Sequence, residues 1–424
     1  MNVLILGSGG REHALAWRLS FDPGCTRIYV WPGNDGMDGE KIETLHQTFC
    51  RESFDEIIQD KKIHLVIPGA EKYLYEGISD WCSDLKLACF GPSLKASELE
   101  KSKLFSKKIM IENGIPTSRF VDLTDHFQNN FQKALSLTED FKKPVIKISG
   151  PSLGKGVFVC SDAEEARCVI GKLKEHPQPG MEEGILMEEG VTGKEVSLFY
   201  ACSSEKYAYL GSAQDYKRVF DGDKGPNTGG MGAISPVPWV NDDFISKVSQ
   251  KILEPTLKSM KNMGTPFVGV LFLGLMVNGD EINLLEYNVR FGDPETQVLL
   301  PLIEGDLTKF IFNCCSGNFS KELRFNHQVA VHVVKAAKGY PGLFGEEIEK
   351  GQFITTQKNL GDQSKIIFSG VKKINENFFT NGGRVLGVTS WGKNKSEALQ
   401  TCYESLEKVQ FKGEHFRKDI GKNL

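Results

Sequence analysis

The segment NLLEYNVRFGDPETQ, residues 283–297, carries the strongest chemical signal in the sequence. Residues 278–280, Asn-Gly-Asp, are typical of a hairpin turn, so the apolar runs on either side should be antiparallel strands. Residues two apart on a strand share a face, so we expect Glu286, Asn288 and Arg290 to project together. Two oxygen ligands suit magnesium that is bound to nucleotide phosphates. The guanidinium beside them suits the negative charge that develops on a phosphoryl or carboxylate group. A solvated strand face is the alternative, and it explains the apolar neighbours less well.

A second concentration of polar residues is AQDYKRVFDGDKGPNTGGMGAISP, residues 213–236, which reads as a long loop dense in glycine and charge. Lys217 and Arg218 are suited to phosphate or carboxylate, and Asp215 to an amine. Long loops are usually functional or disordered, and the absence of low complexity here favours a functional loop.

Two further features follow strands near the N-terminus. Gly7-Ser8-Gly9-Gly10 lies between a strand and a helix, where backbone N–H groups can receive a phosphate. A dinucleotide fingerprint would need glycine where Glu12 stands, which favours a mononucleotide phosphate over NAD, and a turn without ligand remains open. Glu71 follows another strand and could hold ribose hydroxyls, or could simply be a favourable acid at a helix N-terminus.

The run VIKISGPSLGKGVFVC, residues 145–160, resembles a P-loop only superficially. The P-loop pattern needs glycine at the position of Ser149 and a hydroxyl at that of Gly156. A strand, glycine-rich turn and strand instead indicate a flap over nucleotide phosphates with Lys147 beneath, and a surface hairpin is the alternative. Farther on, Glu195 begins a strand after a turn that could offer backbone groups to adenine and an acid to ribose.

Several elements must position these residues. Residues 1–92 alternate β-branched runs with helix-compatible stretches, which predicts a parallel sheet flanked by helices. Residues 97–113 read as one helix before Gly114. Residues 144–200 predict three strands around a helix at 163–175. A last unit, 328–424, contains three strand-like runs and a helix from 395 to 409.

Composition narrows the class of protein. The 424 residues include 40% hydrophobic and 25% charged residues, which is typical of globular proteins and predicts two to four units. The formal charge of -4 indicates neither a nucleic-acid nor a membrane surface. Ten cysteines without a CxxC motif, a start unlike a signal peptide and no apolar run approaching ~20 residues predict a soluble, cytoplasmic protein.

Taken together, these segments resemble the ATP-grasp ligases and, among them, the glycinamide ribonucleotide synthetase family. The resemblance is carried, in order along nearly the whole chain, by GSGGREHAL, FGPS, SKLFSKKIM, NGIPT, SLGKGV, AQDYKR, GPNTGGMGAISP, EYNVRFGDPETQ, KGYPG, GGRVLGVT and FRKDIG. It implies an α/β and α+β multidomain fold: a Rossmann-like pre-ATP-grasp domain (1–100), an ATP-grasp domain (101–327) with a mobile flap (about 120–190), and a rudiment C-terminal domain (328–424).

The same resemblance implies an activity: ATP-dependent ligation of glycine to 5-phosphoribosylamine through glycyl phosphate, in purine biosynthesis. It implies Mg²⁺ or Mn²⁺ on Glu286 and Asn288. For ATP it implies Lys103, Lys147, Gly154, Lys155, Gly156, Glu188, Glu189 and Glu195. For phosphoribosylamine it implies Gly9, Gly10, Arg11 and Glu71, for glycine Asp215, Arg290 and Asp293, and for catalysis Arg290, Asp215 and Lys217. It also implies transient contact with an upstream amidotransferase, and it leaves a monomer or a dimer open.

Three positions depart from the family pattern: Ala70 and Ser149 stand where it has proline and aspartate, and Tyr216 stands where it has histidine. Alternative functions are another ATP-grasp ribonucleotide ligase or a bicarbonate-using carboxylase, and a non-catalytic nucleotide-binding relative. A Rossmann oxidoreductase is a further class, which Glu12 disfavours. The strand expected beside Glu286 offers only Leu271, Phe272 and Leu273, and therefore no further acid for a metal. If two ions bind, Glu286 should bridge them, and its loss should be more damaging than that of Asn288.

Overall fold

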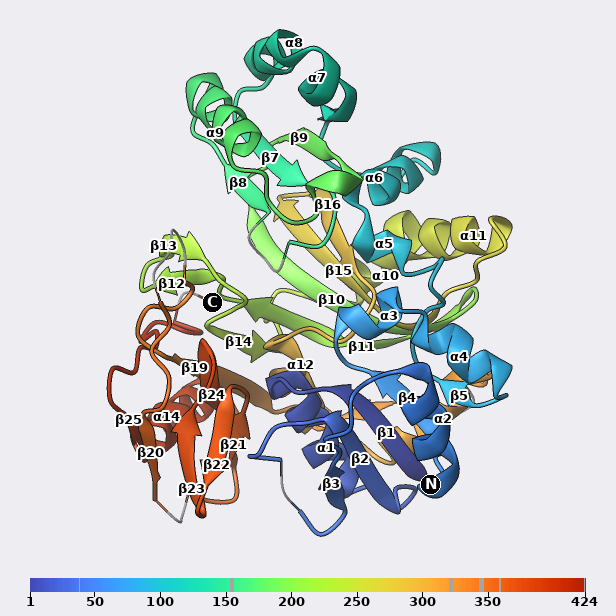
Figure 1. The fold of residues 1–424 in the computed structure, drawn as a ribbon, viewed down its shortest axis with the longest axis vertical. Helices are drawn as coiled ribbons and strands as arrows, with labels where there is room; N and C mark the ends of the chain where they lie inside the picture. Colours follow the sequence, from blue (N-terminus) through green and yellow to red (C-terminus); the bar gives the residue numbers. More distant parts are fainter. Residues whose placement is uncertain (38, 153–155, 320–322, 343–346, 358–359, 423) are drawn as a thin grey trace.

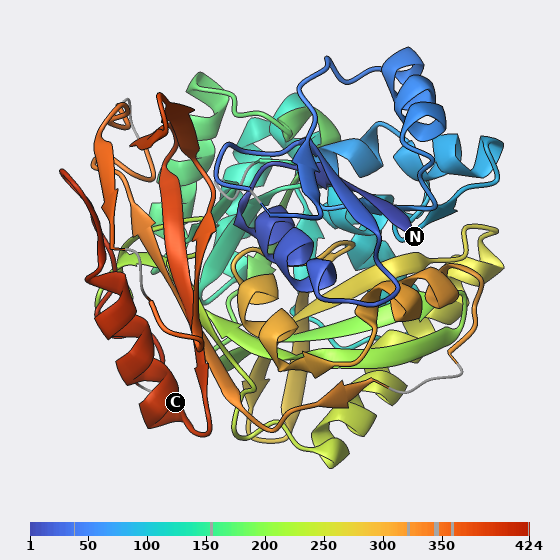
Figure 2. The same ribbon diagram turned by 90° about the horizontal axis from the view of Figure 1, so that it is seen from below.

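The structure is a computed structural model that describes residues 1–37, 39–152, 156–319, 323–342, 347–357, 360–422 and 424. In Figure 1 the N-terminal unit (blue) and the C-terminal unit (red) lie side by side at the bottom, a central sheet runs above them, and a small unit projects at the top. Seen from below, in Figure 2, the N-terminal unit lies against the central sheet and its orange helices. Within the described residues, no helix is both long and apolar enough to cross a membrane.

The N-terminal unit is the predicted parallel sheet flanked by helices. Its five strands are all parallel, in the order β3-β2-β1-β4-β5. Strand β1 lies at the centre of this sheet. Val3, Leu4, Ile5 and Leu6 are fully buried because both faces of the strand are covered. The elements are β1 (Asn2–Gly7), α1 (Gly10–Ser20), β2 (Arg27–Pro32), β3 (Ile42–Thr44), α2 (Arg51–Asp60), β4 (Leu65–Pro68), α3 (Glu71–Tyr75), α4 (Ile78–Asp84) and β5 (Ala88–Cys89).

The predicted helix over residues 97–113 is two helices, α5 (Glu98–Lys101) and α6 (Lys103–Glu112). Ser102 separates them because its backbone is extended and its hydroxyl accepts a hydrogen bond from the N–H of Phe105 at 3.2 Å. A serine in this position begins a new helix instead of continuing the old one. The break places Lys103 in the first turn of α6, where its N–H donates to the carbonyl of Ser149 at 3.0 Å.

The projecting unit contains the three predicted strands and the predicted helix at 163–175, but it begins earlier than predicted, at residue 120, and residues 194–200 belong to the central sheet instead. Its antiparallel sheet has the order β6-β9-β7-β8, and its helices cover one side. Asp162 begins α9 by accepting a hydrogen bond from the N–H of Glu165 at 2.9 Å. The elements are β6 (Phe120–Asp122), α7 (Thr124–Asn129), α8 (Phe131–Ser136), a 3₁₀ turn (Leu137–Asp140), β7 (Pro144–Ile148), β8 (Val157–Val159), α9 (Ala163–Glu175), a 3₁₀ turn (Met181–Glu183) and β9 (Ile185–Glu189).

An eight-stranded sheet, in the order β16-β15-β10-β11-β14-β19-β24-β21, joins the middle of the chain to its C-terminal part. The predicted hairpin turn is present, with Gly279 at φ +59° between β15 and β16. Its central elements are β10 (Lys194–Ser203), β11 (Lys206–Asp215), β14 (Gly232–Ser235), α10 (Asp242–Val248), a π turn (Ser249–Leu253), α11 (Glu254–Asn262), β15 (Val268–Asn278), β16 (Glu281–Asn288), α12 (Glu295–Leu299), a 3₁₀ turn (Leu300–Leu302), β17 (Ile303–Glu304), α13 (Leu307–Cys315) and β18 (Arg324–Phe325).

The interpretation of residues 213–236 as one long loop is wrong in part. A small hairpin, β12 (Arg218–Phe220) and β13 (Lys224–Asn227), and the buried strand β14 interrupt it. The C-terminal elements are β19 (Val329–Ala336), β20 (Phe353–Thr356), β21 (Ser364–Phe368), β22 (Val371–Ile374), β23 (Asn377–Thr380), β24 (Arg384–Gly392), α14 (Lys395–Leu406) and β25 (Val409–Phe411).

Candidate active site

A cavity of about 410 Å³ lies where the N-terminal unit, the projecting unit, the central sheet and the C-terminal unit meet. Eleven of the predicted site residues line it: Arg11, Glu71, Lys103, Gly156, Glu188, Asp215, Lys217, Glu286, Asn288, Arg290 and Asp293. Five others do not: Gly9, Gly10, Lys147, Glu189 and Glu195. Gly154 and Lys155 lie outside the described residues.

The β15–β16 hairpin presents Glu286 and Asn288 to this cavity. Glu286 pairs with Gly274 and Asn288 with Phe272 on the neighbouring strand. A Cβ on Gly274 would lie 3.2 Å from Cγ of Glu286, so glycine leaves room for the acid. No further acid comes from β15 beside these two residues, as the sequence predicted.

The donor set of Glu286 and Asn288 fits a hard divalent cation. Among the described residues, Glu286 forms no ion pair or hydrogen bond with another side chain, and Asn288 Oδ1 accepts only a 3.3 Å bond from Arg290. Within the same residues, no three His, Cys, Asp or Glu side chains are grouped to hold a metal alone. Mg²⁺ prefers oxygen and often takes one or two protein ligands with nucleotide phosphates and water, so these two residues suffice.

Arg290 lies beyond the end of β16 and is held by two carboxylates. Its Nη2 lies 2.7 Å from Glu100 and its Nε lies 3.1 Å from Glu71. Glu100 also accepts the N–H of Val289 at 2.8 Å. The Arg290 guanidinium lowers the pKa of Glu71 to about 2. Arg290 therefore ties the N-terminal unit to the hairpin, and much of its hydrogen-bonding capacity is already used.

The opposite wall is built around Glu188, which is 2% exposed. Its carboxylate lies 3.0 Å from Lys147 and 3.2 Å from Lys107, and it accepts a 2.7 Å bond from Ser118. Burial raises the pKa of Glu188, but the two lysines outweigh that effect and leave the pKa below its usual value. Burial lowers the pKa of Lys107 to about 8. A carboxylate thus holds two cations at the wall where nucleotide phosphates were expected.

Glu189 and Glu195 lie away from this wall. Successive strand residues face opposite sides, so Glu189 turns outward, where it accepts the N–H groups of Lys142 and Lys143. Glu195 forms an ion pair with Lys217. Lys217 also lies 3.2 Å from Asp215. Burial works against its charge, but Asp215 and Glu195 raise the pKa of Lys217 well above its usual value. Lys217 is therefore a fixed cation at the cavity.

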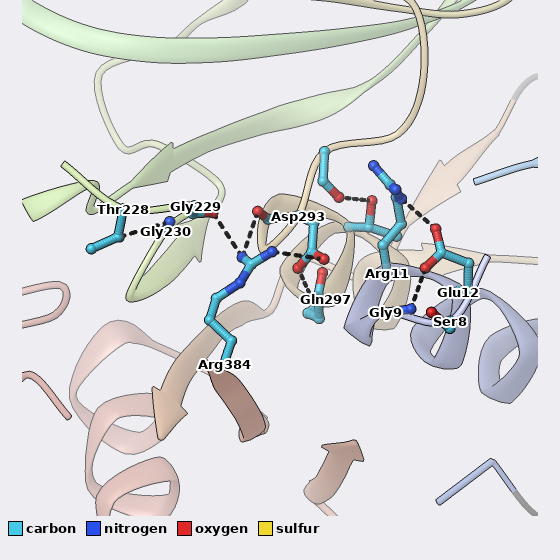
Figure 3. A network of polar contacts seen from close by, with 12 residues as sticks. Ser8, Gly9, Arg11, Glu12, Thr228, Gly229, Gly230, Asp293, Gln297 and Arg384 are labelled. Carbon is cyan, nitrogen blue, oxygen red and sulfur yellow. Dashed lines mark hydrogen bonds and ion pairs between the residues drawn. The ribbon is translucent and has the colours of Figure 1, made fainter. Parts of the chain in front are cut away.

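The N-terminal glycine loop holds a carboxylate of the protein itself. Glu12 accepts the N–H of Gly9 and the Nε of Arg11, each at 2.6 Å (Figure 3). A Cβ on Gly69 would lie 2.1 Å from Glu12 Oε1, and one on Gly7 would lie 2.5 Å from its Cδ. Glu12 thus occupies the space above these glycines and takes the N–H of Gly9, so this N–H is not free for the phosphate that was expected at the loop. Arg11, oriented by Glu12, still lines the cavity.

Asp293 is held by the C-terminal unit. Arg384, at the start of β24, lies 3.1 Å from Asp293 Oδ2 and donates to the carbonyls of Asp293 at 2.9 Å and Gly229 at 2.7 Å (Figure 3). Gln297 donates to Asp293 Oδ1 at 2.8 Å. Both oxygens of Asp293 are therefore engaged, and a Cβ on Gly9 would lie 3.2 Å from Oδ2. A Cβ on Gly10 would lie 2.8 Å from Gln297 Nε2, so both glycines are closely packed.

Two of the three departures from the family pattern have structural partners outside the cavity. Ser149 is fully buried, and its hydroxyl accepts the N–H of Leu104 in the first turn of α6 at 3.2 Å. The hydroxyl of Tyr216 accepts the N–H of Gly421 at 2.9 Å, and the Arg417 guanidinium lies 5.0 Å from its ring. Ala70 precedes α3 without a side-chain cap.

Four charged residues that line the cavity were not singled out from the sequence: Glu100, Lys107, Glu295 and Arg384. Lys107 had a usable signal, since it lies four residues after Lys103 and therefore on the same helix face. Glu295 and Arg384 belong to the quoted motifs RFGDPETQ and GGRVLGVT, but nothing in their local pattern shows that they meet at one cavity.

Comparisons with known proteins cover nearly the whole chain. Family models for phosphoribosylglycinamide synthetase match its N domain at residues 1–100, its ATP-grasp (A) domain at 101–296 and its C domain at 330–423. The phosphoribosylamine–glycine ligase of Mesorhizobium japonicum is 38% identical over 99% of this chain and 98% of its own length. That of Synechocystis is 39% identical over 99% of both. A trifunctional purine biosynthetic protein of Gallus gallus is 38% identical, with 42% of its length matched.

Solved structures agree. The phosphoribosylamine–glycine ligase of Thermotoga maritima has a TM-score of 0.82 and 33% identity, covering 99% of this chain and all of that one. A biotin carboxylase domain from Hydrogenobacter thermophilus, solved with MgADP and bicarbonate, has a TM-score of 0.72, covering 98% of this chain and 91% of that one. It is only 15% identical, so it shows that the fold is shared and nothing more.

Proposed function

This chain belongs to the phosphoribosylglycinamide synthetase family, and from that premise we propose that the cavity described above is its active site, with Glu286 and Asn288 as the cation ligands. The chain has the pre-ATP-grasp, ATP-grasp and C-terminal domains of that family. It is an ATP-dependent ligase that joins glycine to 5-phosphoribosylamine in purine biosynthesis.

The observation that carries the site assignment is the pairing of charges across the cavity. Glu286 lines the cavity without an ion pair to another described side chain, while the facing walls carry Lys103, Lys107 and Lys217. A triphosphate with a divalent cation satisfies both sides, since the lysines meet phosphate oxygens and Glu286 meets the cation. We assign the cation as Mg²⁺ or Mn²⁺. When bound it neutralises phosphate charge and orients the γ-phosphate.

In the first step, a carboxylate oxygen of glycine attacks the γ-phosphorus, and the bond to the ADP oxygen breaks. This gives glycyl phosphate and ADP. Lys103 and Lys217, which line the cavity, are placed to stabilise the charge that spreads over the transferred oxygens, and Lys147 supports them from behind the lining. Lys147 lies behind the lining and is held by Glu188 and by a 3.5 Å bond to the carbonyl of Leu285. Its position is therefore fixed before substrate arrives.

In the second step, the amine of phosphoribosylamine attacks the carbonyl carbon of glycyl phosphate. Phosphate leaves, the amide bond forms and the nitrogen loses a proton. We assign Arg11 and Glu71 to the ribosylamine, because both line the cavity from the N-terminal unit and face the hairpin. We assign Gly156 and its flap to the phosphates, and flap closure to the exclusion of water that would hydrolyse the acyl phosphate.

The remaining assignments complete the proposal. We assign catalytic roles to Asp215, Lys217 and Arg290, which line the cavity, and a binding role to Asp293, which Arg384 holds in place. We place the domain boundaries at 1–100, 101–327 and 328–424, with the flap at about 120–190. All ten cysteines are free thiols, which supports the cytoplasm as the compartment. Transient contact with the enzyme that supplies the amine, and a monomer or a dimer, remain predictions.

The test follows ADP release with ATP, Mg²⁺, glycine and phosphoribosylamine generated in situ from ribose 5-phosphate and ammonia. We expect turnover that needs both glycine and the ribosylamine. Turnover that continues without glycine, or that requires bicarbonate in its place, would favour the carboxylase alternative. ATP binding without any turnover would favour a non-catalytic relative.

A further inference from the structure

The cavity is lined by seven carboxylates from the described part of the chain, and their partners distinguish them. Five hold a cation of the protein: Glu71 and Glu100 pair with Arg290, Glu188 with Lys107 and Lys147, Asp215 with Lys217, and Asp293 with Arg384. The remaining two are Glu286 and Glu295. Glu286 is assigned to the cation above, so Glu295 is the carboxylate without an assignment.

Glu295 is built into the cavity wall. It is the first residue of α12 and is 4% exposed. Its carboxylate lies over Gly292, where a Cβ would be 2.5 Å from Oε2, so glycine at that position leaves the acid its space. Among the described side chains none forms an ion pair or hydrogen bond with it, and only its own backbone N–H does so. A buried acid without a side-chain partner is costly, so it points to a ligand group that binds in the cavity.

The substrates supply one group that needs such an acid. Glycine binds as a zwitterion, and its ammonium group in a buried cavity needs a carboxylate partner. The attacking amine of phosphoribosylamine is neutral and has no such need. Asp215, the other acid beside Glu295, is already paired with Lys217 at 3.2 Å.

We propose that Glu295 binds the ammonium group of glycine, beside Asp215, and so selects an amino acid as the acyl donor. This inference rests on the proposed function and names the substrate group that one residue of the same site recognises. Glycine would then lie with its ammonium group at α12 and its carboxylate towards Lys103 and Lys107, where we place the phosphates of ATP. Glu295 contacts substrate directly in this arrangement, which makes it a specificity-determining residue.

The charges around Glu295 predict how binding depends on pH. Asp215, Lys217, Arg290 and Arg384 are the charged groups that act on it. Burial, followed by the charge of Asp215, raises the pKa of Glu295 to about 8, so the free protein carries it largely protonated at pH 7. An ammonium ion favours the ionised form, so glycine binding should release protons at pH 7, and this release should shrink as the pH rises above the pKa of Glu295.

The test measures glycine binding and turnover in Glu295→Gln and in Glu304→Gln, an exposed acid that serves as the matched control. We expect Glu295→Gln to raise the KM for glycine on the order of a hundredfold, and by no less than about tenfold. The KM for ATP should stay within about twofold of the wild-type value. Glu295→Asp should recover part of the loss. Glycolate, whose hydroxyl replaces the ammonium, should inhibit the wild-type protein weakly. Its inhibition constant should differ less between wild type and Glu295→Gln than the KM for glycine does.

Calorimetry in two buffers of different ionisation enthalpy, with a non-hydrolysable ATP analogue present, gives the proton release. Glu295→Gln should abolish that release, and Gly292→Ala should raise the glycine KM because the added methyl displaces the acid. A wild-type glycine KM and undiminished proton release in Glu295→Gln would overturn the inference. Because glycine-dependent turnover of the wild type is measured in parallel, that outcome is distinct from failure of the ligase assignment itself.

Discussion

Arg384 and Asp293 lie 91 positions apart in the chain, yet the guanidinium of the first holds both the carboxylate and the carbonyl of the second. The same guanidinium holds the carbonyl of Gly229. The C-terminal unit thereby fixes two segments of the ATP-grasp part: the segment around Gly229 and the turn before α12. It contributes to the proposed active site through positioning, and Arg384 is its residue that lines the cavity.

Arg384→Lys should lower kcat/KM by roughly 10- to 100-fold with little loss of fold, because one ammonium cannot reproduce three hydrogen bonds in different directions and small misplacements are costly. Steady-state kinetics and thermal unfolding measure both effects. Arg324→Lys, at an exposed arginine, is the control. Equal kinetics for the two variants would refute the positioning role.

Gly69→Ala should destabilise the protein by about 2 kcal/mol. The added Cβ would lie 2.1 Å from Glu12 Oε1, and Glu12 is fixed by Gly9 and Arg11. Gly171→Ala is a matched control inside α9, where a Cβ meets nothing within 4 Å, and it should stabilise by roughly 0.5 to 1 kcal/mol. Chemical unfolding gives both values, and opposite signs are the diagnostic result.

Glu188→Gln should lower the free energy of unfolding by about 3 kcal/mol and raise the KM for ATP, because Lys107 and Lys147 lose their shared buried partner. Glu189→Gln changes the next residue of the same strand, whose carboxylate faces outward. We expect it to change neither quantity by much. If the two substitutions affected the KM for ATP equally, our placement of the nucleotide wall would be wrong.

Glu71 gives a pH dependence of stability. Its pKa is lowered from 4.5 to about 2 in the folded protein, chiefly by Arg290. A lowered acid pKa stabilises the fold above pH 4.5, and this contribution is lost as the pH falls towards 2. With the side chain 31% exposed, we expect roughly 2 kcal/mol at neutral pH. Urea unfolding at pH 7 and pH 3 should show a smaller fall in Glu71→Gln than in the wild type; parallel falls would contradict this.

Much of the fold could be predicted because local patterns determine it. The β-branched run at β7, the cap at Asp162 before α9 and the Asn-Gly-Asp turn at residues 278–280 each specify their element from neighbours in the sequence. The break at Ser102 was missed, because a serine inside a helical pattern can also simply continue it. The β12–β13 hairpin was missed because its short strands lie in a glycine-rich segment.

The meeting of side chains at one cavity could be predicted where a single segment carries them, as for Glu286 and Asn288. Relations between distant segments could not be predicted from local patterns. Nothing near Glu12 in the sequence shows that its carboxylate fills the N-terminal glycine loop. Nothing near Arg384 shows that β24 joins the central sheet and that its first residue lies beside Asp293. Such contacts depend on tertiary packing, and the resemblance to a family supplied their order but not their partners.

Replacing the cation ligands separates their roles. Glu286→Gln removes a charge and should abolish activity, and Asn288→Ala removes a neutral ligand and should reduce activity less, by about 100-fold. Titration of ADP release with Mg²⁺ measures the apparent affinity for the cation. Equal losses in both variants, or none, would contradict the assignment.

The central claim is that this cavity activates glycine through its carboxylate. Turnover with glycine labelled with ¹⁸O in both carboxylate oxygens tests it most directly. We expect each released phosphate to carry one labelled oxygen, because the attacking oxygen leaves with the phosphorus. Unlabelled phosphate would contradict a glycyl phosphate intermediate.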